Sequence, residues 1–285
     1  MRGFLTRLFV AAAAAAALTV VLPNAGAAMG ATVTGATVTG AGAATGATVT
    51  GAAAPTRTAP VAAAAVNHTV TFVNHSSQKL WIGSGVNADG SKQFTRLPVL
   101  APGQSATVTI PETAAPLHWR GKFFARQGCG GALGSAFHCR VADCGPAADH
   151  CTTGEQPASL AEFNFDAKDG AAPWYDVSYV NAFSLPITIT PVNATIPAGG
   201  GCDTRGCAAN LLPYCPPADL TRGPDGKPML CTNPSRDTPS SYSRALSAKC
   251  PKAYTWSKQD QVPGNKVMQQ CSRCSGFTVT FGPTA

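Results

Sequence analysis

The chain has 285 residues, of which 45% are hydrophobic and only 12% are charged, so it has enough apolar side chain to build a buried core. Its 29 glycines and 23 prolines leave little room for long helices, which predicts a mainly β domain rich in loops. The formal net charge is +7, but the basic residues are scattered and do not interleave with aromatic residues, so no nucleic-acid partner is expected.

The N-terminus has the features of a secretory signal peptide. Arg2 and Arg7 precede an apolar, alanine-rich run at 8–22, and small residues up to Ala27 provide a cleavage site. This run is shorter than the roughly 20 apolar residues that span a bilayer, and no later segment is long enough either. We therefore expect residues 1–27 to be removed and the mature chain, without a transmembrane segment, to be secreted and extracellular.

Residues 28–66 form a low-complexity segment of Ala, Gly, Thr and Val, in which TVTGA begins at Thr32, Thr37 and Thr48. Threonine and valine alternate as in a strand, but the repeated glycines and the lack of large side chains leave nothing to bury. The composition predicts a flexible spacer, with a wall-tethering or O-glycosylated stalk as the alternative. The folded domain is expected to occupy 67–285.

Short alternating segments follow from Asn67 onward. Strands are predicted at 69–73, 80–82 and 105–110, separated by segments that contain glycine, aspartate and proline. A last strand is predicted at 277–281, where two phenylalanines and a valine would point inward and two threonines outward. This spacing of short strands is typical of a mainly β fold.

Two alternating runs in the middle of the domain place acidic residues on neighbouring strands. In one run Ala161, Phe163 and Phe165 alternate with Leu160, Glu162 and Asn164, and in the other Tyr175, Val177 and Tyr179 alternate with Asp176, Ser178 and Val180. A period of two residues puts Glu162 and Asp176 on the more polar faces of these strands. Two carboxylates are therefore expected to face one groove.

The 11 cysteines all lie between Cys129 and Cys274. Such a density is typical of a disulfide framework formed in an oxidising compartment. Zinc binding is the alternative, because Cys271 and Cys274 form a C-x-x-C, and His138 and His150 each precede a cysteine. No second closely spaced C-x-x-C completes a tetrahedral site, so no metal is expected. Spacing alone leaves the pairing of the cysteines open.

Several segments resemble the thaumatin-like proteins of the pathogenesis-related thaumatin and osmotin type. They occur in the family's order and are VTFVNHSSQKLWIGSG (70–85), HWRGKFFARQGC (118–129), LAEF (160–163), YDVSYVNAF (175–183), LPITITP (185–191) and YSRALSAKCPKAYTW (242–256). The resemblance implies a mainly β fold, a flattened β-sandwich with a small disulfide-rich loop region and a cleft between them. Because 215–250 contains few cysteines, the chain resembles a shortened, small-form member.

The resemblance also implies a cysteine pairing. Carried over position by position, it pairs Cys129 with Cys139, Cys144 with Cys151, Cys202 with Cys271, Cys207 with Cys250, and Cys215 with Cys231. Cys274 is left as a free buried thiol, an intermolecular partner or an alternative partner of Cys202. One family disulfide is expected to be absent, because its two positions hold His75 or Ser76 and Gly282.

In the family, an arginine, a glutamate and three aspartates line the cleft, whose acidity is associated with antifungal activity and β-1,3-glucan recognition. The matching residues here are, in that order, Lys122, Glu162, Asp176, Asn181 and Gln259, and Asp260 restores a carboxylate if the match shifts by one residue. Glycoside hydrolysis needs two carboxyl groups, and an amide cannot exchange a proton near neutral pH. Hydrolysis is therefore expected to be weak or absent, with Glu162 and either Asp176 or Asp260 as the remaining catalytic pair.

The acidic residues also have a structural interpretation, in which Lys122 pairs with Glu162 or Asp176 and both carboxylates bind neighbouring loops. Surface ion pairs of this kind typically contribute only about 0–1 kcal/mol. The aromatic residues near the cleft can stack on sugar rings or pack in the core, and Phe183 is expected in the core. They are Phe123, Phe124, Trp174, Tyr175 and Phe183.

The resemblance therefore predicts a secreted defence protein that binds a β-1,3-glucan or similar wall polysaccharide through an acidic cleft, with antifungal activity. One alternative is an endo-β-1,3-glucanase with Glu162 as its acid, and another is an inhibitor of a partner hydrolase acting through disulfide-held loops. The sequence contains no nucleophile triad, phosphate-binding glycine loop or dinucleotide fingerprint, so no cofactor is expected. The protein is expected to be a monomer.

Overall fold

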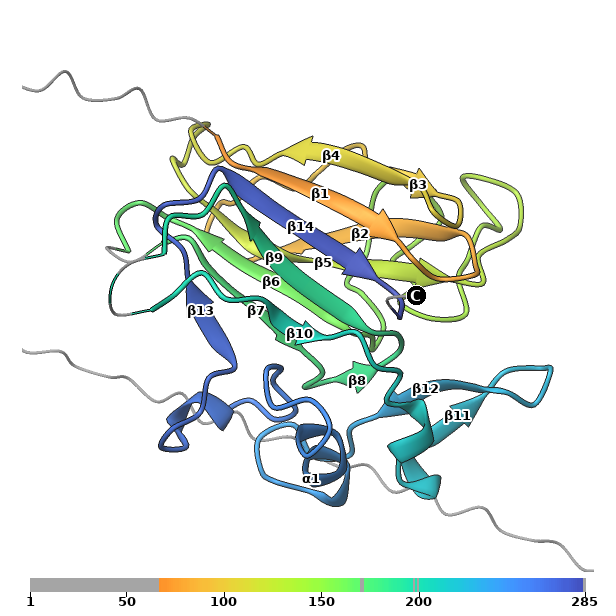
Figure 1. The fold of residues 1–285 in the computed structure, drawn as a ribbon. Coiled ribbons are helices and arrows are strands. Elements are labelled where there is room, and N and C mark those ends of the chain that lie inside the picture. Colours follow the sequence, from red (N-terminus) through yellow and green to blue (C-terminus); the bar gives the residue numbers. More distant parts are fainter. Residues whose placement is uncertain (1–66, 170–171, 197, 199, 284–285) are drawn as a thin grey trace, which may run out of the picture. The chain divides into compact units, whose positions relative to one another are not determined.

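Two β-sheets lie face to face, and a smaller region adjoins one end of them (Figure 1). The computed structural model describes residues 67–169, 172–196, 198 and 200–283, and the predicted signal peptide and spacer lie outside these ranges. None of the helices in the described residues is long and apolar enough to cross a membrane. The expected mainly β sandwich is confirmed.

The larger sheet carries both of the acidic strands that alternation predicts. Its strands are β2 (Leu80–Val86), β3 (Val99–Leu100), β5 (Trp119–Gln127), β6 (Leu160–Phe165), β7 (Trp174–Ser178) and β13 (Met268–Gln270). They pair antiparallel in the order β13-β7-β6-β5-β2-β3. Along β6 and β7 the residues that point to the core are buried, and Glu162, Asn164, Trp174 and Asp176 remain partly exposed.

The second sheet joins the two ends of the folded chain. Its strands are β1 (Thr69–Asn74), β4 (Ser105–Thr109), β9 (Ile187–Val192), β10 (Arg205–Cys207) and β14 (Gly276–Phe281), in the order β10-β9-β14-β1-β4. The last strand, β14, runs parallel to β1 and antiparallel to β9. As predicted, Phe277, Val279 and Phe281 are buried.

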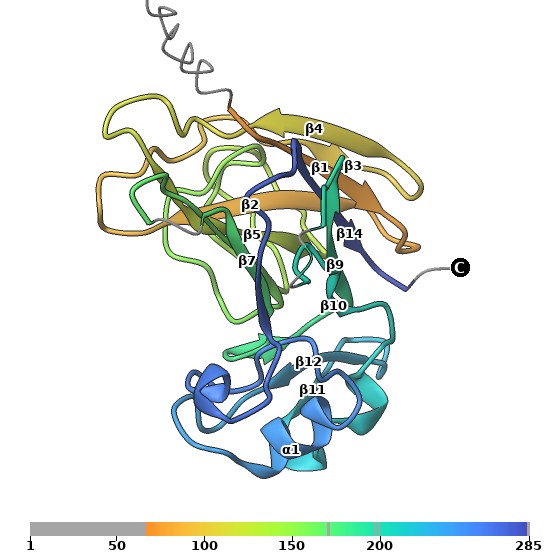
Figure 2. The same ribbon diagram turned by 60° about the vertical axis from the view of Figure 1, so that its left-hand side comes forward.

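Figure 2 shows the two sheets from a second direction. Aromatic side chains fill the core between them. Phe72 from one sheet meets Phe123 from the other with ring centroids 5.0 Å apart, and Phe277 meets Phe163 at 5.3 Å. Edge-to-face pairs of this kind add about 0.5–1.5 kcal/mol each beyond the area they bury. The core therefore fixes which face of β6 and β7 is turned outward.

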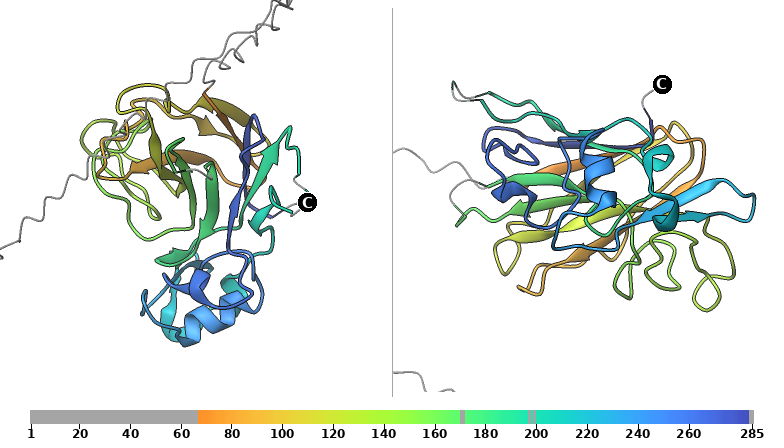
Figure 3. Two further views of the ribbon diagram at one scale, coloured as in Figure 1. Left: turned by 90° about the vertical axis from the view of Figure 1, so that its left-hand side faces the viewer. Right: turned by 90° about the horizontal axis from the view of Figure 1, so that it is seen from below.

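The smaller region consists of short elements held by disulfides (Figure 3). It contains β8 (Ala182–Phe183), β11 (Leu220–Arg222), β12 (Pro228–Thr232), the helix α1 (Ser241–Ser247) and the 3-10 helices η1 (Leu212–Tyr214), η2 (Pro217–Asp219) and η3 (Gln259–Gln261). A capping box between Ser240 and Ser243 starts α1. The Tyr242 hydroxyl donates a 2.7 Å hydrogen bond to the Tyr179 carbonyl, which anchors the helix to the chain beyond β7.

Five disulfides have the pairing that the resemblance implies. They are Cys129–Cys139, Cys144–Cys151, Cys202–Cys271, Cys207–Cys250 and Cys215–Cys231, and Cys274 is a free cysteine. The first two hold a long loop between β5 and β6, which packs on the outer face of the larger sheet through Val141, Ala142 and Ala158. This loop covers one end of that face and leaves the rest open.

The positions of the absent family disulfide lie against each other. The His75 amide donates a 2.8 Å hydrogen bond to the Phe281 carbonyl. A Cβ atom on Gly282 would lie 2.9 Å from Ser76 Cα, and Gly282 has a φ of +101°, which L side chains rarely adopt. Close backbone contact therefore lies where the resemblance would place this disulfide.

Candidate functional site

One row of opposed residues crosses the outer face of the larger sheet. In the strand register Gly85 lies opposite Lys122, Lys122 opposite Glu162, Glu162 opposite Asp176, and Asp176 opposite Met268. Directly opposed residues point to the same face, with Cβ atoms about 4.5–5.5 Å apart. The sheet thus brings together the lysine and the two carboxyl groups that the sequence singles out.

Two hollows lie on either side of the acidic pair Glu162 and Asp176, and both contain these two residues. The smaller, of about 250 Å³, faces the disulfide-rich region and is also lined by Lys122, Leu160, Ser178, Val180, Asn181, Arg236, Tyr254 and Ser257. The larger, of about 460 Å³, is also lined by Asn87, Gly121, Phe163, Asn164, Asp169, Trp174 and Met268. We refer to them as the lower and the upper hollow. Together they form the candidate cleft.

Lys122 is paired with a carboxylate that sequence reasoning missed. Its Nζ lies 2.5 Å from Oε1 of Glu155, which follows the Cys144–Cys151 loop. Gly85 leaves room for this pair, because a Cβ atom there would lie 3.1 Å from Lys122 Cε and 3.4 Å from Glu155 Oε2. The pairing of Lys122 with Glu162 or Asp176 that the structural interpretation expects is therefore replaced by a pair with Glu155.

The acidic pair holds its protons more tightly than free carboxyl groups do. Burial raises the pKa of Glu162, and the positive charge of Lys122 offsets part of this increase. Burial also raises the pKa of Asp176 well above its usual value, and the negative charges of Glu162 and Asp260 raise it further. Asp176 Oδ1 is buried and has no hydrogen-bond partner among the described residues. The pair is thus an electrostatically costly arrangement.

The three remaining cleft candidates occupy different environments. Asn181 lines the lower hollow. Gln259 is only 5% exposed, lines neither hollow, and its Oε1 accepts hydrogen bonds from Thr255 N at 2.7 Å and Thr255 Oγ1 at 2.9 Å. Asp260, the next residue of η3, is exposed, and its charge acts on Asp176. Asp260 lines neither hollow, and within this pair of neighbours it is the one that acts on the acidic pair, through its charge.

Of the aromatic candidates, only Trp174 is available to a ligand. Phe123, Phe124, Tyr175 and Phe183 are at most 1% exposed and belong to the core. Trp174 is partly exposed and lines the upper hollow. A signal for this difference exists in the sequence, because Trp174 stands two residues before Asp176 and therefore shares its face of the strand.

Other cleft residues come from loops that alternation does not place. Arg236 follows β12 and reaches the lower hollow, and its charge lowers the pKa of Glu162. Asn87 follows β2 and reaches the upper hollow. Nothing in the spacing of these residues or of Glu155 indicates the cleft, because the positions of their loops depend on disulfides and on packing far along the chain.

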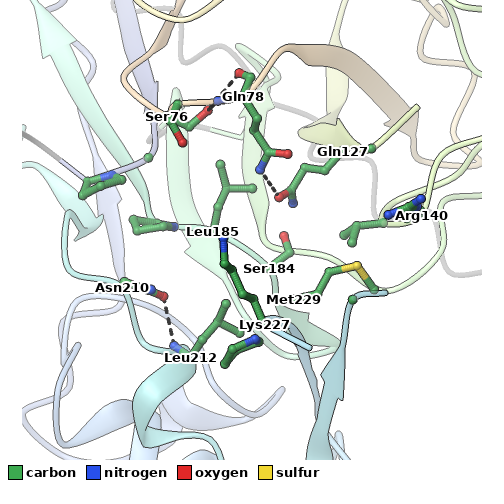
Figure 4. Close-up of a pocket in the computed structure, with 18 of the residues that line it drawn as sticks. Ser76, Gln78, Gln127, Arg140, Ser184, Leu185, Asn210, Leu212, Lys227 and Met229 are labelled. Atoms are coloured by element: carbon green, nitrogen blue, oxygen red, sulfur yellow. Dashed lines mark hydrogen bonds between the residues drawn. The ribbon is translucent and has the colours of Figure 1, made fainter. Parts of the chain in front are cut away.

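A hollow larger than either of these lies elsewhere, between the ends of β1, β5 and the β11–β12 hairpin (Figure 4). It has a volume of about 650 Å³ and contains none of the predicted cleft residues. Several of its polar groups bond to one another or to the backbone: Gln78 Nε2 donates to Gln127 Oε1 over 2.7 Å, and Asn210 Oδ1 accepts from Leu212 N over 3.1 Å. Size alone therefore does not identify the acidic cleft.

Comparison with known proteins points to one family. The model of the thaumatin family matches residues 74–283. The chain is 32% identical over 235 residues to thaumatin-like protein 2 of Prunus persica and 29% identical over 235 residues to a glucan endo-1,3-beta-glucosidase of Prunus avium, in each case covering 75% of this chain and 90% of the relative. It is 32% identical over 238 residues to pathogenesis-related thaumatin-like protein 3.5 of Cryptomeria japonica, with the same coverage. A solved structure, the thaumatin-like xylanase inhibitor TLXI, aligns with a TM-score of 0.41 and 16% identity over 75% of this chain and 99% of that one.

Proposed function

Because the chain belongs to the thaumatin family, we propose that it is a secreted protein that binds a cell-wall polysaccharide of the β-1,3-glucan type through the cleft around Glu162 and Asp176. The observation that carries this proposal is the row of polar residues across the open face of the larger sheet, with a hollow on each side of the acidic pair. Antifungal activity is the proposed consequence of that binding.

The chemistry of the cleft suits a hydroxyl-rich, uncharged ligand. Carboxyl oxygens and the amide of Asn181 accept and donate hydrogen bonds to sugar hydroxyls, and Ser178 and Ser257 add hydroxyl groups to the lower hollow. Lys122 is already neutralised by Glu155 at 2.5 Å, so it is not a free cation for an anionic ligand.

The raised pKa values of Glu162 and Asp176 favour binding over hydrolysis. A glycosidase needs one protonated carboxyl group as acid and one ionised carboxylate as base or nucleophile. The pKa values of Glu162 and Asp176 are both raised, which suits the role of Glu162 as an acid but opposes the role of Asp176 as a nucleophile. Because one relative is named a glucan endo-1,3-beta-glucosidase, hydrolysis of β-1,3-glucan is the second candidate function, with Asp260 as the alternative base.

The test is to incubate the mature protein with insoluble β-1,3-glucan and to measure both pelleted protein and released reducing sugar. We expect retention in the pellet without sugar release, and weaker retention of Glu162→Ala and Asp176→Ala. Asp225→Ala, which removes an exposed carboxylate on the β11–β12 hairpin, is the matched control and should be retained like the wild type. Equal retention of all four proteins would remove the cleft from the proposal, and sugar release lost in Glu162→Gln would support the enzyme.

A further inference from the structure

The upper hollow continues the cleft along the direction of the strands. Successive outward residues of β7 are Trp174, Asp176 and Ser178, and the first lines the upper hollow, the second both hollows and the third the lower hollow. On β6, Asn164 lines the upper hollow and Leu160 the lower one in the same order. From Trp174 to Ser178 the strand advances about 13 Å. The two hollows therefore form one path across the acidic pair.

The upper hollow differs from the lower one in having the partly exposed indole of Trp174 and no basic residue, whereas Tyr254 of the lower hollow is only 9% exposed. Trp174 stands beside Met268, which is 38% exposed, and the exposed Asn87 completes the opposite side. The polar groups of Asn164 are already used, since its Nδ2 donates to Asp169 Oδ2 over 2.7 Å and its Oδ1 accepts from Asp166 N over 3.0 Å. The volume of about 460 Å³ lies within the range of about 300–1,000 Å³ usual for ligand sites.

The backbone of Trp174 is held within the sheet. It pairs with Asn164 of β6 on one side and with Gln270 of β13 on the other, so its backbone lies inside the sheet rather than at an edge. Its chain neighbour Tyr175 points to the opposite face and packs 4.9 Å from Phe277 in the core. Because a tryptophan side chain has only two rotatable torsions, its indole binds the face of a ring at low entropic cost.

We propose that the upper hollow is a subsite in which Trp174 stacks on a neutral sugar ring, so that the cleft binds an internal stretch of polysaccharide across both hollows rather than a single terminal sugar. This inference rests on the proposed function. The upper hollow has no basic side chain to bind an acidic sugar, and the indole face supplies the apolar contact that a neutral ring needs.

The test measures binding of the β-1,3-linked glucose dimer and hexamer to the mature protein by titration calorimetry. The hexamer should bind more tightly than the dimer. Trp174→Ala should lower the affinity for the hexamer about tenfold and largely remove the difference in affinity between the two ligands. Trp174→Phe should recover part of the loss. Trp256→Phe is the matched control, since Trp256 lines neither hollow.

Two further measurements keep the outcome independent of folding. Met268→Arg places a larger side chain in the upper hollow at an exposed position. It should lower the affinity for the hexamer and leave the thermal midpoint of the protein unchanged. The hexamer should change the tryptophan fluorescence of the wild type and of Trp256→Phe but not of Trp174→Phe. Unchanged hexamer affinity in Trp174→Ala and Met268→Arg, while Glu162→Ala loses binding, would overturn the subsite and leave the proposed function intact. Absence of binding by the wild type would overturn both.

Discussion

Lys122 and Glu162 lie directly opposite each other on β5 and β6, yet the ammonium group of Lys122 lies 2.5 Å from Glu155. The cation of the sheet that lies opposite Glu162 is thus paired with a carboxylate from a loop. Glu162 keeps a raised pKa in consequence, because Lys122 offsets its burial only in part and the charge of Glu155 adds to the increase. A loop residue therefore adds to the effect of burial on the pKa of a residue in the sheet.

Replacing Glu155 should lower the pKa of Glu162. Glu155→Gln removes one negative charge and frees Lys122 to interact with Glu162, and both changes favour the ionised carboxylate. The measurement is a carbon-detected NMR titration of the glutamate carboxyl groups in the variant and the wild type. Asp225→Asn removes one negative charge from an exposed loop outside the cleft and should leave the titration of Glu162 unchanged. A pKa of Glu162 that does not fall in Glu155→Gln contradicts this account.

Asp176→Asn should stabilise the fold at neutral pH while it weakens glucan binding. Burial raises the folded-state pKa of Asp176, so the folded chain holds this proton more tightly than the unfolded chain, whose pKa is about 4. Between the two pKa values unfolding releases a proton, and stability falls as the pH rises. The variant should therefore unfold at a higher temperature than the wild type at pH 7, and the difference should disappear at pH 3.

A scan of thermal midpoint against pH checks this prediction. Asp225→Asn, at an exposed position, should follow the wild type at every pH. A midpoint of Asp176→Asn that is lower than that of the wild type at pH 7 would show that the ionised carboxylate makes a stabilising contact instead.

Arg126 should be essential for the loop that covers one end of the outer face. Its side chain is fully buried, and it donates hydrogen bonds to the carbonyls of Ala147 at 2.6 Å and Gly145 at 2.9 Å. Arg126→Met leaves both carbonyls without this donor, and we expect a loss of about 2–4 kcal/mol in the free energy of unfolding. Urea unfolding measures it, and Arg140→Met, an exposed position in the same loop, should change it little.

Cys274 should be a slowly reacting thiol. Burial raises its pKa to about 11, so roughly one molecule in a thousand carries the thiolate at pH 8. A thiol-specific reagent should modify the native protein slowly and label one cysteine per chain after unfolding in denaturant without reductant. Cys274→Ser should show no labelling in either state. Fast labelling of the native protein, or a disulfide-linked dimer on a non-reducing gel, would contradict the buried free thiol.

The sequence predicts the parts of the molecule in which the spacing of residues along the chain determines the direction of their side chains. Alternation places Glu162 and Asp176 on neighbouring strands and Phe277, Val279 and Phe281 in the core, because a strand repeats every two residues wherever it lies. The same rule, counted from Asp176, places Trp174 on the outer face of β7 and Tyr175 on the core face. It cannot place Glu155, whose approach to Lys122 depends on a loop held by the Cys144–Cys151 disulfide.

The choice between Gln259 and Asp260 shows a second limit. The two residues are neighbours in a short 3-10 helix, and family resemblance alone matches the cleft position to Gln259. In the structure the amide of Gln259 turns inward to Thr255, which leaves Asp260 as the exposed carboxylate. Which of two adjacent side chains faces a cleft depends on the rotation of a single helical turn, and that rotation is decided by hydrogen bonds rather than by periodicity.

The parallel pairing of β1 with β14 has a consequence for the order in which the protein can be made. The strand that is synthesised last lies between β1 and β9, in the interior of its sheet. A nascent chain that ends before residue 276 therefore lacks a central strand rather than an edge strand. Without β14, no strand connects β1 to β9 within the sheet. The sheet β10-β9-β14-β1-β4 therefore cannot reach its native strand order before residues 276–281 have been synthesised.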